Sequence, residues 1–285
     1  MIEPAGEVIF VESVTIKDTV IPKLGLGTWR LADKECRDMV LAALEDGWRH
    51  IDTAAMYANE AEVGKGIRSS GVPRDDVFLT TKVWYDKIAP EDMIRSCEDS
   101  LDRLGLDYAD LILIHWPNPR IPLKESIEGL LELKARGWVK AIGVSNFTSG
   151  MMREAQGYAG GALVANQVEY HPLLSQKRVL EAAEELDMAI TAYAPIARGR
   201  VSDVPVIRDI AKKHGKTEAQ VALRWLIQQE RVIAVPKTAR RERLRENAGA
   251  LTFELMPDEM DALFALGSAS GRTVNMDWAP KWDSE

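Results

Sequence analysis

Short apolar runs alternate with helical stretches along almost the whole chain, and this alternation constrains the fold most. An expected hairpin within residues 7–27, turning near Lys17 and Asp18, leads into the first of eight runs that are typical of buried strands. Eight strand–helix units in one chain favour a closed parallel (β/α)8 TIM barrel. The expected strands end near residue 27 and cover 48–53, 77–82, 109–115, 138–145, 162–169, 188–194 and 231–237.

Turn and cap residues mark the boundaries of the expected helices. Asp33 and Ser175 are good N-cap residues, Pro90 favours a helix start, Gly105 favours a helix stop, and a capping box begins at Thr217. These signals predict helices over 33–45, 59–69, 90–104, 124–136 and 204–214, and helices starting near 149, 175, 217, 240 and 257. A tail with two tryptophans follows and is expected near the mouth of the barrel.

An open, doubly wound sheet is the competing architecture. It calls for a glycine-rich turn after an early strand, and the candidate at residues 25–30 lacks the third glycine. No phosphate-binding loop of the Walker type is present. The chain has 285 residues, and α/β barrels routinely use about 250 as one domain, so residues 1–285 are expected to form a single barrel domain.

Composition and charge narrow the class of protein. The net charge of -8 repels phosphate backbones, which makes nucleic acid an unexpected partner. No apolar run approaches the ~18 residues of a membrane span, and the acidic start does not resemble a signal peptide. Cys36 and Cys97 are far apart and are expected to be buried free thiols. A cytoplasmic protein without a membrane partner fits these features.

Four side chains of different chemistry follow three consecutive strands. Asp52 and Tyr57 follow the second strand, while Lys82 and His115 end the third and fourth. Because the carboxyl ends of parallel strands meet at one end of a barrel, these groups are expected to converge there. A carboxylate, a phenol, an ammonium and an imidazole together predict a proton-handling site.

The phenol of Tyr57 is the candidate general acid. Its reference pKa near ~10 makes it a weak acid at neutral pH. An ammonium at ~4 Å, supplied by Lys82, is worth ~4 kcal/mol at an effective dielectric of ~20, which predicts a fall of ~3 pKa units. Asp52 would keep that ammonium charged, and His115 would orient the substrate oxygen. The alternative for these residues is a buried Asp–Lys ion pair with a satisfied Tyr and His nearby.

A basic cluster at residues 237–245 follows the last expected strand. Loops after strands seven and eight often hold phosphate in barrels, and a helix N-terminus attracts an anion. A solvated basic face is the alternative, although the acidic balance of the chain makes a local cluster more notable. Tryptophans follow the first, third and fourth strands, and a methionine precedes Tyr57. Together they could form an aromatic substrate pocket: Trp29, Met56, Trp84 and Trp116.

Eight ordered motifs resemble the aldo-keto reductase superfamily. They are GLGTW at 25–29, DTAAMYANEAEVG at 52–64, LTTKVW at 79–84, LILIHWP at 111–117, IGVSNF at 142–147, NQVEYHP at 166–172, AYAPI at 192–196 and VPKTARRERLREN at 235–247. The match covers essentially the whole chain and looks most like bacterial reductases of 2,5-diketo-gluconate and methylglyoxal. The resemblance implies a monomeric barrel that moves hydride from NADPH to a carbonyl without a metal, with Asp52, Tyr57, Lys82 and His115 as the catalytic tetrad.

The same resemblance implies a set of cofactor contacts. The nicotinamide carboxamide would be held by residues at the ends of strands five and six, and an aromatic ring at the end of strand seven would stack on it. The adenosine 2′-phosphate would bind the basic cluster, where threonine replaces the family's serine, and two further residues would contact adenine. The implied contacts are Gly27, Thr28, Trp29, Ser145, Asn146, Gln167, Tyr193, Lys237, Thr238, Arg243, Glu246 and Asn247, with Arg240 as an extra cation.

These features predict an NADPH-dependent reductase of small aldehydes and ketones, such as α-dicarbonyls and keto-sugar acids. A metal- or phosphate-dependent barrel lyase or isomerase is disfavoured, because the four histidines show no metal-binding spacing and His171 is best explained as structural. A regulatory barrel that binds NADPH with little turnover is the alternative outside catalysis. The short segment 116–123 after strand four predicts an open pocket for small, electron-poor substrates.

Overall fold

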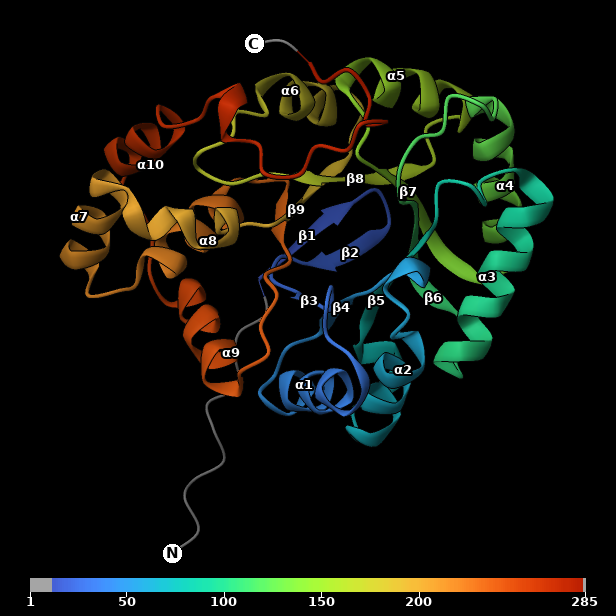
Figure 1. The fold of residues 1–285 in the computed structure, drawn as a ribbon, viewed down its shortest axis with the longest axis horizontal. Coiled ribbons are helices and arrows are strands. Elements are labelled where there is room, and N and C mark those ends of the chain that lie inside the picture. The colour runs from blue at the N-terminus through green and yellow to red at the C-terminus, as the bar shows by residue number, and fades with distance from the viewer. Residues whose placement is uncertain (1–11, 284–285) are drawn as a thin grey trace, which may run out of the picture.

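Eight parallel strands form the centre of the computed structural model, which describes residues 12–283 (Figure 1). Neighbouring strands follow the chain order from β3 to β10, so every connection is a strand–helix–strand crossover. The strands are β3 (Leu26–Gly27), β4 (His50–Asp52), β5 (Phe78–Val83), β6 (Ala109–Ile114), β7 (Val139–Ser145), β8 (Leu163–Glu169), β9 (Ala189–Tyr193) and β10 (Val232–Ala234).

The first and last strands meet and close the sheet. The Gly25 N–H donates to the Ala234 carbonyl over 2.9 Å, and the Ala234 N–H donates to the Lys23 carbonyl over 2.8 Å. One step further, Gly27 forms a parallel bridge with Lys237. A Cβ on Gly27 would come within 2.8 Å of the Val235 carbonyl oxygen, so only glycine fits this seam. The predicted (β/α)8 barrel is confirmed.

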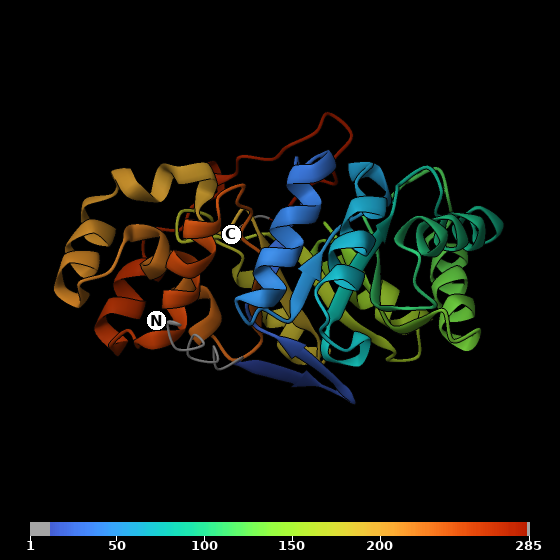
Figure 2. The same ribbon diagram turned by 90° about the horizontal axis from the view of Figure 1, so that it is seen from below.

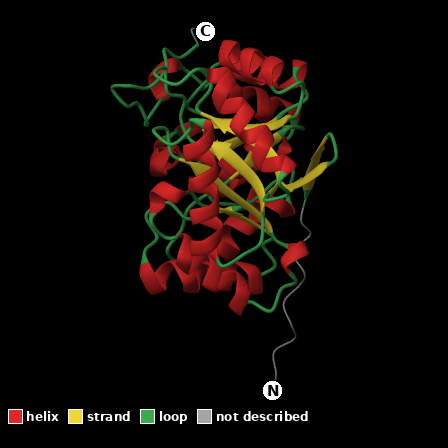
Figure 3. Cartoon of the chain, turned by 90° about the vertical axis from the view of Figure 1, so that its right-hand side faces the viewer, coloured by secondary structure: helices red, strands yellow, loops and turns green. Residues whose placement is uncertain are grey.

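Helices surround the strands on the outside of the barrel, as the view from the side makes clear (Figure 3). The strands are rich in apolar residues because both of their faces are buried. The helices are α1 (Asp33–Glu45), α2 (Glu60–Ser69), α3 (Pro90–Leu104), α4 (Leu123–Ala135), α5 (Ser149–Tyr158), α6 (Lys177–Glu185), α7 (Pro205–His214), α8 (Glu218–Gln228), α9 (Arg241–Ala248) and α10 (Pro257–Phe264).

The predicted hairpin is formed by β1 (Ser13–Ile16) and β2 (Thr19–Pro22), which pair antiparallel. It covers one end of the barrel, opposite the C-terminal tail (Figure 2). Its apolar side chains join a second cluster inside the barrel that includes Leu113 and Ile233. The expected start of the hairpin, at residues 7–11, and the acidic N-terminus lie outside the described residues.

Two of the predicted helix caps are wrong by one residue each. The N-cap of α1 is Ala32, whose backbone is extended, so Asp33 is the first helical residue. The N-cap of α6 is Gln176 rather than Ser175, and its side chain donates to a backbone carbonyl of β8 instead of capping the helix. The capping box at Thr217 is confirmed, with both reciprocal hydrogen bonds formed.

The two cysteines are buried and unpaired, as predicted. Burial raises the pKa of Cys36 and of Cys97 to about 12, so neither thiol is a reactive thiolate at neutral pH. Within residues 12–283, no helix is both long and apolar enough to cross a membrane.

Candidate active site

The four side chains predicted to converge do lie together. Asp52 ends β4, Lys82 lies in β5, His115 directly follows β6, and Tyr57 ends a short 3-10 turn (Ala55–Tyr57) after β4. The parallel register pairs β4 with β5 and β5 with β6, so these elements present their carboxyl ends side by side. The site is therefore built at the end of the barrel opposite the hairpin.

Lys82 is the centre of the hydrogen-bond network. Its Nζ donates to Asp52 Oδ1 over 2.6 Å, to the Thr53 carbonyl over 2.8 Å and to Tyr57 Oη over 3.4 Å. The Lys82 side chain is fully buried. Burial lowers the pKa of Lys82, and the charge of Asp52 opposes that effect. The ammonium is thus held between an anion and the phenol.

Burial determines the acidity of Tyr57. The phenol of half-buried Tyr57 has a pKa well above its usual value because the surrounding protein would desolvate the phenolate, and the nearby Asp52 carboxylate adds to the rise. The predicted lowering by Lys82 is therefore wrong for this structure. That prediction included the attraction of the ammonium but left out the desolvation of the phenol, which is the larger effect. Tyr57 consequently keeps its proton at neutral pH.

His115 completes the group as a neutral imidazole. Its ring lies edge-on to Tyr57, with 5.6 Å between ring centroids, and 5.1 Å from the ring of Trp84. Burial lowers the pKa of His115 well below its usual value, and the charge of Lys82 adds to this effect. The His115 Nδ1 atom is buried and has no hydrogen-bond partner within the described chain. Placing the proton on Nε2 avoids an unpaired buried N–H.

Polar side chains at the ends of β7 and β8 form a connected network. Gln167 Nε2 donates to Asp52 Oδ2 over 2.7 Å, and Ser145 Oγ donates to the Gln167 carbonyl over 2.8 Å. Asn146 Nδ2 donates to the His115 carbonyl over 2.9 Å, while its Oδ1 accepts the Tyr193 hydroxyl over 2.8 Å. The sequence predicted that these residues contact the nicotinamide of the cofactor. The structure shows that the side chains of Gln167 and Asn146 also form hydrogen bonds with Asp52 and His115 of the tetrad.

The basic cluster contains two kinds of cation. Arg241 and Arg245 form ion pairs with Asp46 at the end of α1. Lys237, Arg240 and Arg243 form no ion pair with any described residue, and all three are exposed. The bridge between Gly27 and Lys237 brings the GLGTW segment beside this loop. Unpaired cations at this place suit a phosphate.

The other residues of this segment are partly engaged within the protein. The Thr238 hydroxyl accepts from the Arg240 N–H over 3.1 Å. Glu246 accepts from Thr217 over 3.1 Å, and Asn247 is buried. Thr28 is also buried, and its hydroxyl donates to the Asp52 carbonyl over 3.0 Å.

Two of the tryptophans predicted for the substrate pocket lie against the tetrad, Trp29 beside Tyr57 and Trp84 beside His115. Trp29 lies 4.9 Å from the Tyr57 ring, and Met56 is exposed beside it. On the other side, Trp84 and Trp116 both contact Trp278 of the C-terminal tail, at 6.0 and 5.2 Å between ring centroids. The C-terminal tail thus adds one wall to the predicted substrate pocket.

Several residues that support the site were missed by sequence reasoning. Asn59 Nδ2 donates to the carbonyls of Thr28 and Leu31, both over 2.9 Å. Glu60 is buried behind Lys82, where it accepts from Thr81 over 2.6 Å and pairs with Arg103 over 2.7 Å. A signal was present in the sequence, since two polar residues follow Tyr57 at the start of a helix that packs on the barrel.

His171 is fully buried, and its Nε2 lies 3.3 Å from Glu169 Oε1, in agreement with its predicted structural role. No group of three His, Cys, Asp or Glu side chains within residues 12–283 has the spacing of a metal site.

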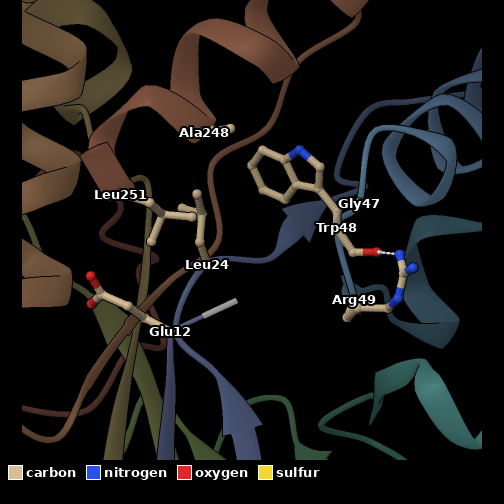
Figure 4. A pocket seen from close by; sticks show the side chains of 7 residues that line it. All are labelled: Glu12, Leu24, Gly47, Trp48, Arg49, Ala248 and Leu251. Carbon is tan, nitrogen blue, oxygen red and sulfur yellow. Dashed lines mark hydrogen bonds between the residues drawn. The ribbon is translucent and has the colours of Figure 1, made fainter. Parts of the chain in front are cut away.

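A small cavity near the closing seam of the barrel is not the functional site. It has a volume of ≈ 10 Å³ and is lined by apolar side chains such as Leu24 and Leu251 around the Trp48 indole (Figure 4). The Arg49 guanidinium, which also lines it, donates to the Trp48 carbonyl over 2.8 Å. Space of this size accepts a single water molecule at most.

Comparison with known proteins gives a consistent result. The model of the Aldo/keto reductase family matches residues 23–267. An "Aldo-keto reductase" of Mycobacterium avium is 42% identical over 258 residues, which are 90% of each chain. The "Methylglyoxal reductase DkgB" of Yersinia pestis is 40% identical over 92% of this chain and 99% of that protein. A crystal structure of a protein assigned as a 2,5-diketo-D-gluconic acid reductase B superposes with a TM-score of 0.94, at 45% identity over 97% of this chain and 99% of that one.

Proposed function

The chain belongs to the aldo/keto reductase family, and on that basis we propose that it is an NADPH-dependent reductase of small aldehydes and ketones. One observation carries the proposal. The Lys82 ammonium lies between Asp52 and the Tyr57 hydroxyl, at 2.6 and 3.4 Å, with a neutral imidazole beside the phenol. This arrangement suits a reaction in which a carbonyl oxygen gains a proton.

Tyr57 is the proposed proton donor. Its raised pKa keeps the phenol protonated at neutral pH, which is the form that a reduction requires. As negative charge develops on the carbonyl oxygen, the Tyr57 hydroxyl donates its proton to that oxygen. The adjacent Lys82 ammonium stabilises the phenolate that remains, and Asp52 holds the ammonium in place.

His115 is the proposed orienting group. The Nε2–H tautomer donates to the same carbonyl oxygen and leaves no N–H of the ring unpaired. The depressed pKa of His115 keeps the imidazole neutral, so it does not compete with Tyr57 as the acid. Trp84 fixes the ring edge-on from the other side.

The chain's residues fit a phosphorylated nicotinamide cofactor. Lys237 and Arg243, with Arg240 as a further cation, have no acidic partner among residues 12–283 and would hold the 2′-phosphate. Ser145, Asn146 and Gln167 would hold the carboxamide. The Tyr193 ring would stack on the nicotinamide, while Gly27, Thr28, Trp29, Thr238, Glu246 and Asn247 would complete the cradle. When bound, the reduced nicotinamide supplies the hydride.

The proposed substrates are small and electron-poor. Two relatives carry the names methylglyoxal reductase and 2,5-diketo-D-gluconic acid reductase, and the loop between β6 and α4 is short. A short loop offers little remote binding energy, so a reactive carbonyl must supply more of the driving force. We propose α-ketoaldehydes, diketones and keto-sugar acids as the substrate class, acted on by a cytoplasmic monomer.

A turnover assay tests this proposal. Purified protein should oxidise NADPH when methylglyoxal is added, and the decrease in NADPH absorbance measures the rate. The rate should be the same before and after exhaustive dialysis against EDTA. Tight NADPH binding without oxidation across a panel of aldehydes, ketones and keto acids would instead support the regulatory barrel. Activity lost on dialysis and restored by one metal would contradict the metal-independent mechanism.

A further inference from the structure

The last described segment, residues 273–283, crosses the mouth of the barrel, and we refer to it as the strap. It follows a 3-10 turn (Ala269–Gly271) after α10 and lies at the end of the barrel opposite the hairpin (Figure 2). The strap contains no helix or strand. Its position must therefore come from side-chain contacts rather than from its own secondary structure.

A buried carboxylate holds the first residues of the strap. Glu169, the last residue of β8, has a fully buried side chain. Its Oε1 accepts from the Thr273 N–H over 2.8 Å and from the Thr273 hydroxyl over 2.5 Å, and its Oε2 accepts from the Val274 N–H over 2.9 Å. Burial opposes ionisation, but hydrogen bonds from His171 and from these strap donors keep the pKa of Glu169 below its usual range.

A second contact holds the far end of the strap. Asp283 accepts from the Ser149 N–H over 2.8 Å and from the Ser149 hydroxyl over 2.9 Å, at the start of α5. A carboxylate at a helix N-terminus is favourably placed for the helix dipole. The strap is thus fixed at both ends by carboxylate hydrogen bonds.

Between its two ends, the strap borders a hollow of ≈ 770 Å³ on one side. Gln176, the N-cap of α6, and Val179 within that helix line this hollow, and Arg272 and Trp282 line it from the tail. The strap therefore lacks continuous packing beneath it. The contacts at its two ends consequently matter more than they would for a tail packed on the core.

The middle of the strap touches the candidate substrate pocket. The Trp278 ring stacks on Tyr85 at 4.6 Å and contacts Trp84 and Trp116. Trp84 in turn lies against the His115 ring at 5.1 Å. A shift of the strap would therefore move one wall of the pocket while leaving the hydrogen bonds between Asp52, Lys82 and Tyr57 in place.

We propose that Glu169 is a positioning residue that sets substrate selectivity: its carboxylate fixes the strap and so holds Trp278 as the wall against which the ring of an aromatic aldehyde packs. The inference rests on the proposed reductase function for its kinetic consequence. Its structural part, that Glu169 orders the strap, stands independently of any activity. Because Trp84 lies between Trp278 and His115 in this series of ring contacts, a three-carbon dicarbonyl at Tyr57 is expected to be too small to reach the wall.

Hydrogen exchange measured by mass spectrometry tests the structural part. In Glu169→Gln the new NH₂ group cannot accept a hydrogen bond from Thr273 or Val274. Amide exchange across residues 273–283 should therefore accelerate by tenfold or more. A tenfold change corresponds to the loss of one contact of ~1.4 kcal/mol. Glu98→Gln makes the same chemical change at an exposed position of α3 and should leave this exchange unchanged. Unaltered exchange of the strap in a folded Glu169→Gln protein would overturn the proposal.

Steady-state kinetics with two substrates tests the selectivity. Glu169→Gln should raise KM for an aromatic aldehyde by roughly tenfold, while kcat and the KM for methylglyoxal stay within about twofold of wild type. Equal losses for both substrates would mean that Glu169 supports the whole site and would refute the selectivity role. A wild-type protein that reduces neither substrate would refute the reductase function but not the exchange result.

A pair of substitutions on the strap covers the case in which Glu169→Gln fails to fold. Thr273→Val removes the hydroxyl donor to Glu169 and keeps the branched shape, whereas Thr273→Ser keeps the donor. The valine variant should show faster strap exchange and a raised KM for the aromatic aldehyde, and the serine variant should resemble wild type. Identical behaviour of the two variants would contradict the proposal.

Discussion

The Gln167 side-chain amide donates a hydrogen bond to Asp52 Oδ2 over 2.7 Å, across 115 positions in the sequence. Asp52 is therefore shared between the Lys82 ammonium on one oxygen and Gln167 on the other. This contact gives Gln167 a role beyond its proposed contact with the cofactor carboxamide, because it fixes the anion on which the charge of Lys82 depends.

Replacing Gln167 with glutamate should separate these two roles. Gln167→Glu places a second carboxylate beside Asp52, and the two cannot both stay ionised at this distance without cost. We expect kcat at pH 7 to fall by about tenfold or more, with part of the loss recovered at lower pH as the pair takes up a proton. A pH profile of kcat measures this, with Gln167→Ala as the uncharged control. A change confined to the KM for NADPH would mean that Gln167 serves only the cofactor.

Tyr57→Phe should abolish most carbonyl reduction. Removing a general acid commonly costs ~10² or more in rate, and the ring would still fill its place beside Trp29 and His115. Cofactor affinity, measured by quenching of protein fluorescence, should change little. Lys82→Met should be comparably damaging, because the phenolate left after proton transfer would lose its cation. Activity within twofold of wild type in Tyr57→Phe would remove this residue from the proton path.

Arg243 and Arg241 form a matched pair for testing cofactor preference. Arg243 has no acidic partner within the described residues, while Arg241 pairs with Asp46 and Glu45. One charge-assisted contact to a 2′-phosphate is worth ~1.5–3 kcal/mol. Arg243→Ala should therefore weaken the binding of NADPH about 10- to 100-fold and leave the binding of NADH nearly unchanged. Arg241→Ala should spare both affinities. Titration calorimetry measures them, and equal losses of NADPH and NADH in Arg243→Ala would make that arginine structural.

The depressed pKa of His115 predicts a flat activity profile around pH 6.5. Burial and the Lys82 charge favour the neutral imidazole, so the ring stays neutral as pH falls from 8 through its usual titration range and gains a proton only well below it. The profile of kcat/KM should therefore show no inflection near 6.5. An inflection there that disappears in His115→Asn would contradict the assignment of a neutral orienting group.

The sequence was sufficient to predict the barrel because its signals are local. Strands buried on both faces appear as short apolar runs, and residues such as Gly105 end the helices between them. The convergence of Asp52, Lys82 and His115 followed from the topology alone, since parallel strands end at one side. The family motifs then suggested the roles of these residues.

The remaining features of the site depend on contacts between distant segments. The pKa of Tyr57 rises because side chains from other segments, among them Trp29 and His115, desolvate the phenol, and desolvation of this kind leaves no local pattern. The partners of Glu169 lie 104 and 105 positions away, on a strap without secondary structure. A buried carboxylate at the end of β8 was the only hint of that contact.

Glu259 gives a prediction about stability that does not depend on the active site. Its side chain, in α10, accepts from Lys213 over 2.6 Å, from His214 over 2.8 Å and from the Met256 N–H over 2.8 Å. Burial opposes ionisation, but the hydrogen bonds outweigh it and lower the pKa of Glu259 to about 2. These contacts attach α10 to the last turn of α7.

A carboxylate whose pKa is lowered by folding stabilises the folded state. This stabilisation is fully present when the pH is above the carboxylate's pKa in the unfolded chain, ~4.3, and is lost as the pH falls toward its pKa in the folded protein. Glu259→Gln should therefore lower the free energy of unfolding at pH 7 by about 1–2 kcal/mol. Below pH 4 the difference from wild type should shrink steadily. Urea unfolding at pH 7, 5, 4 and 3 measures both effects, with Asp258→Asn, an exposed neighbour, as the control. A deficit that stays constant over this range would show that lost packing, rather than the ionised carboxylate, explains the change.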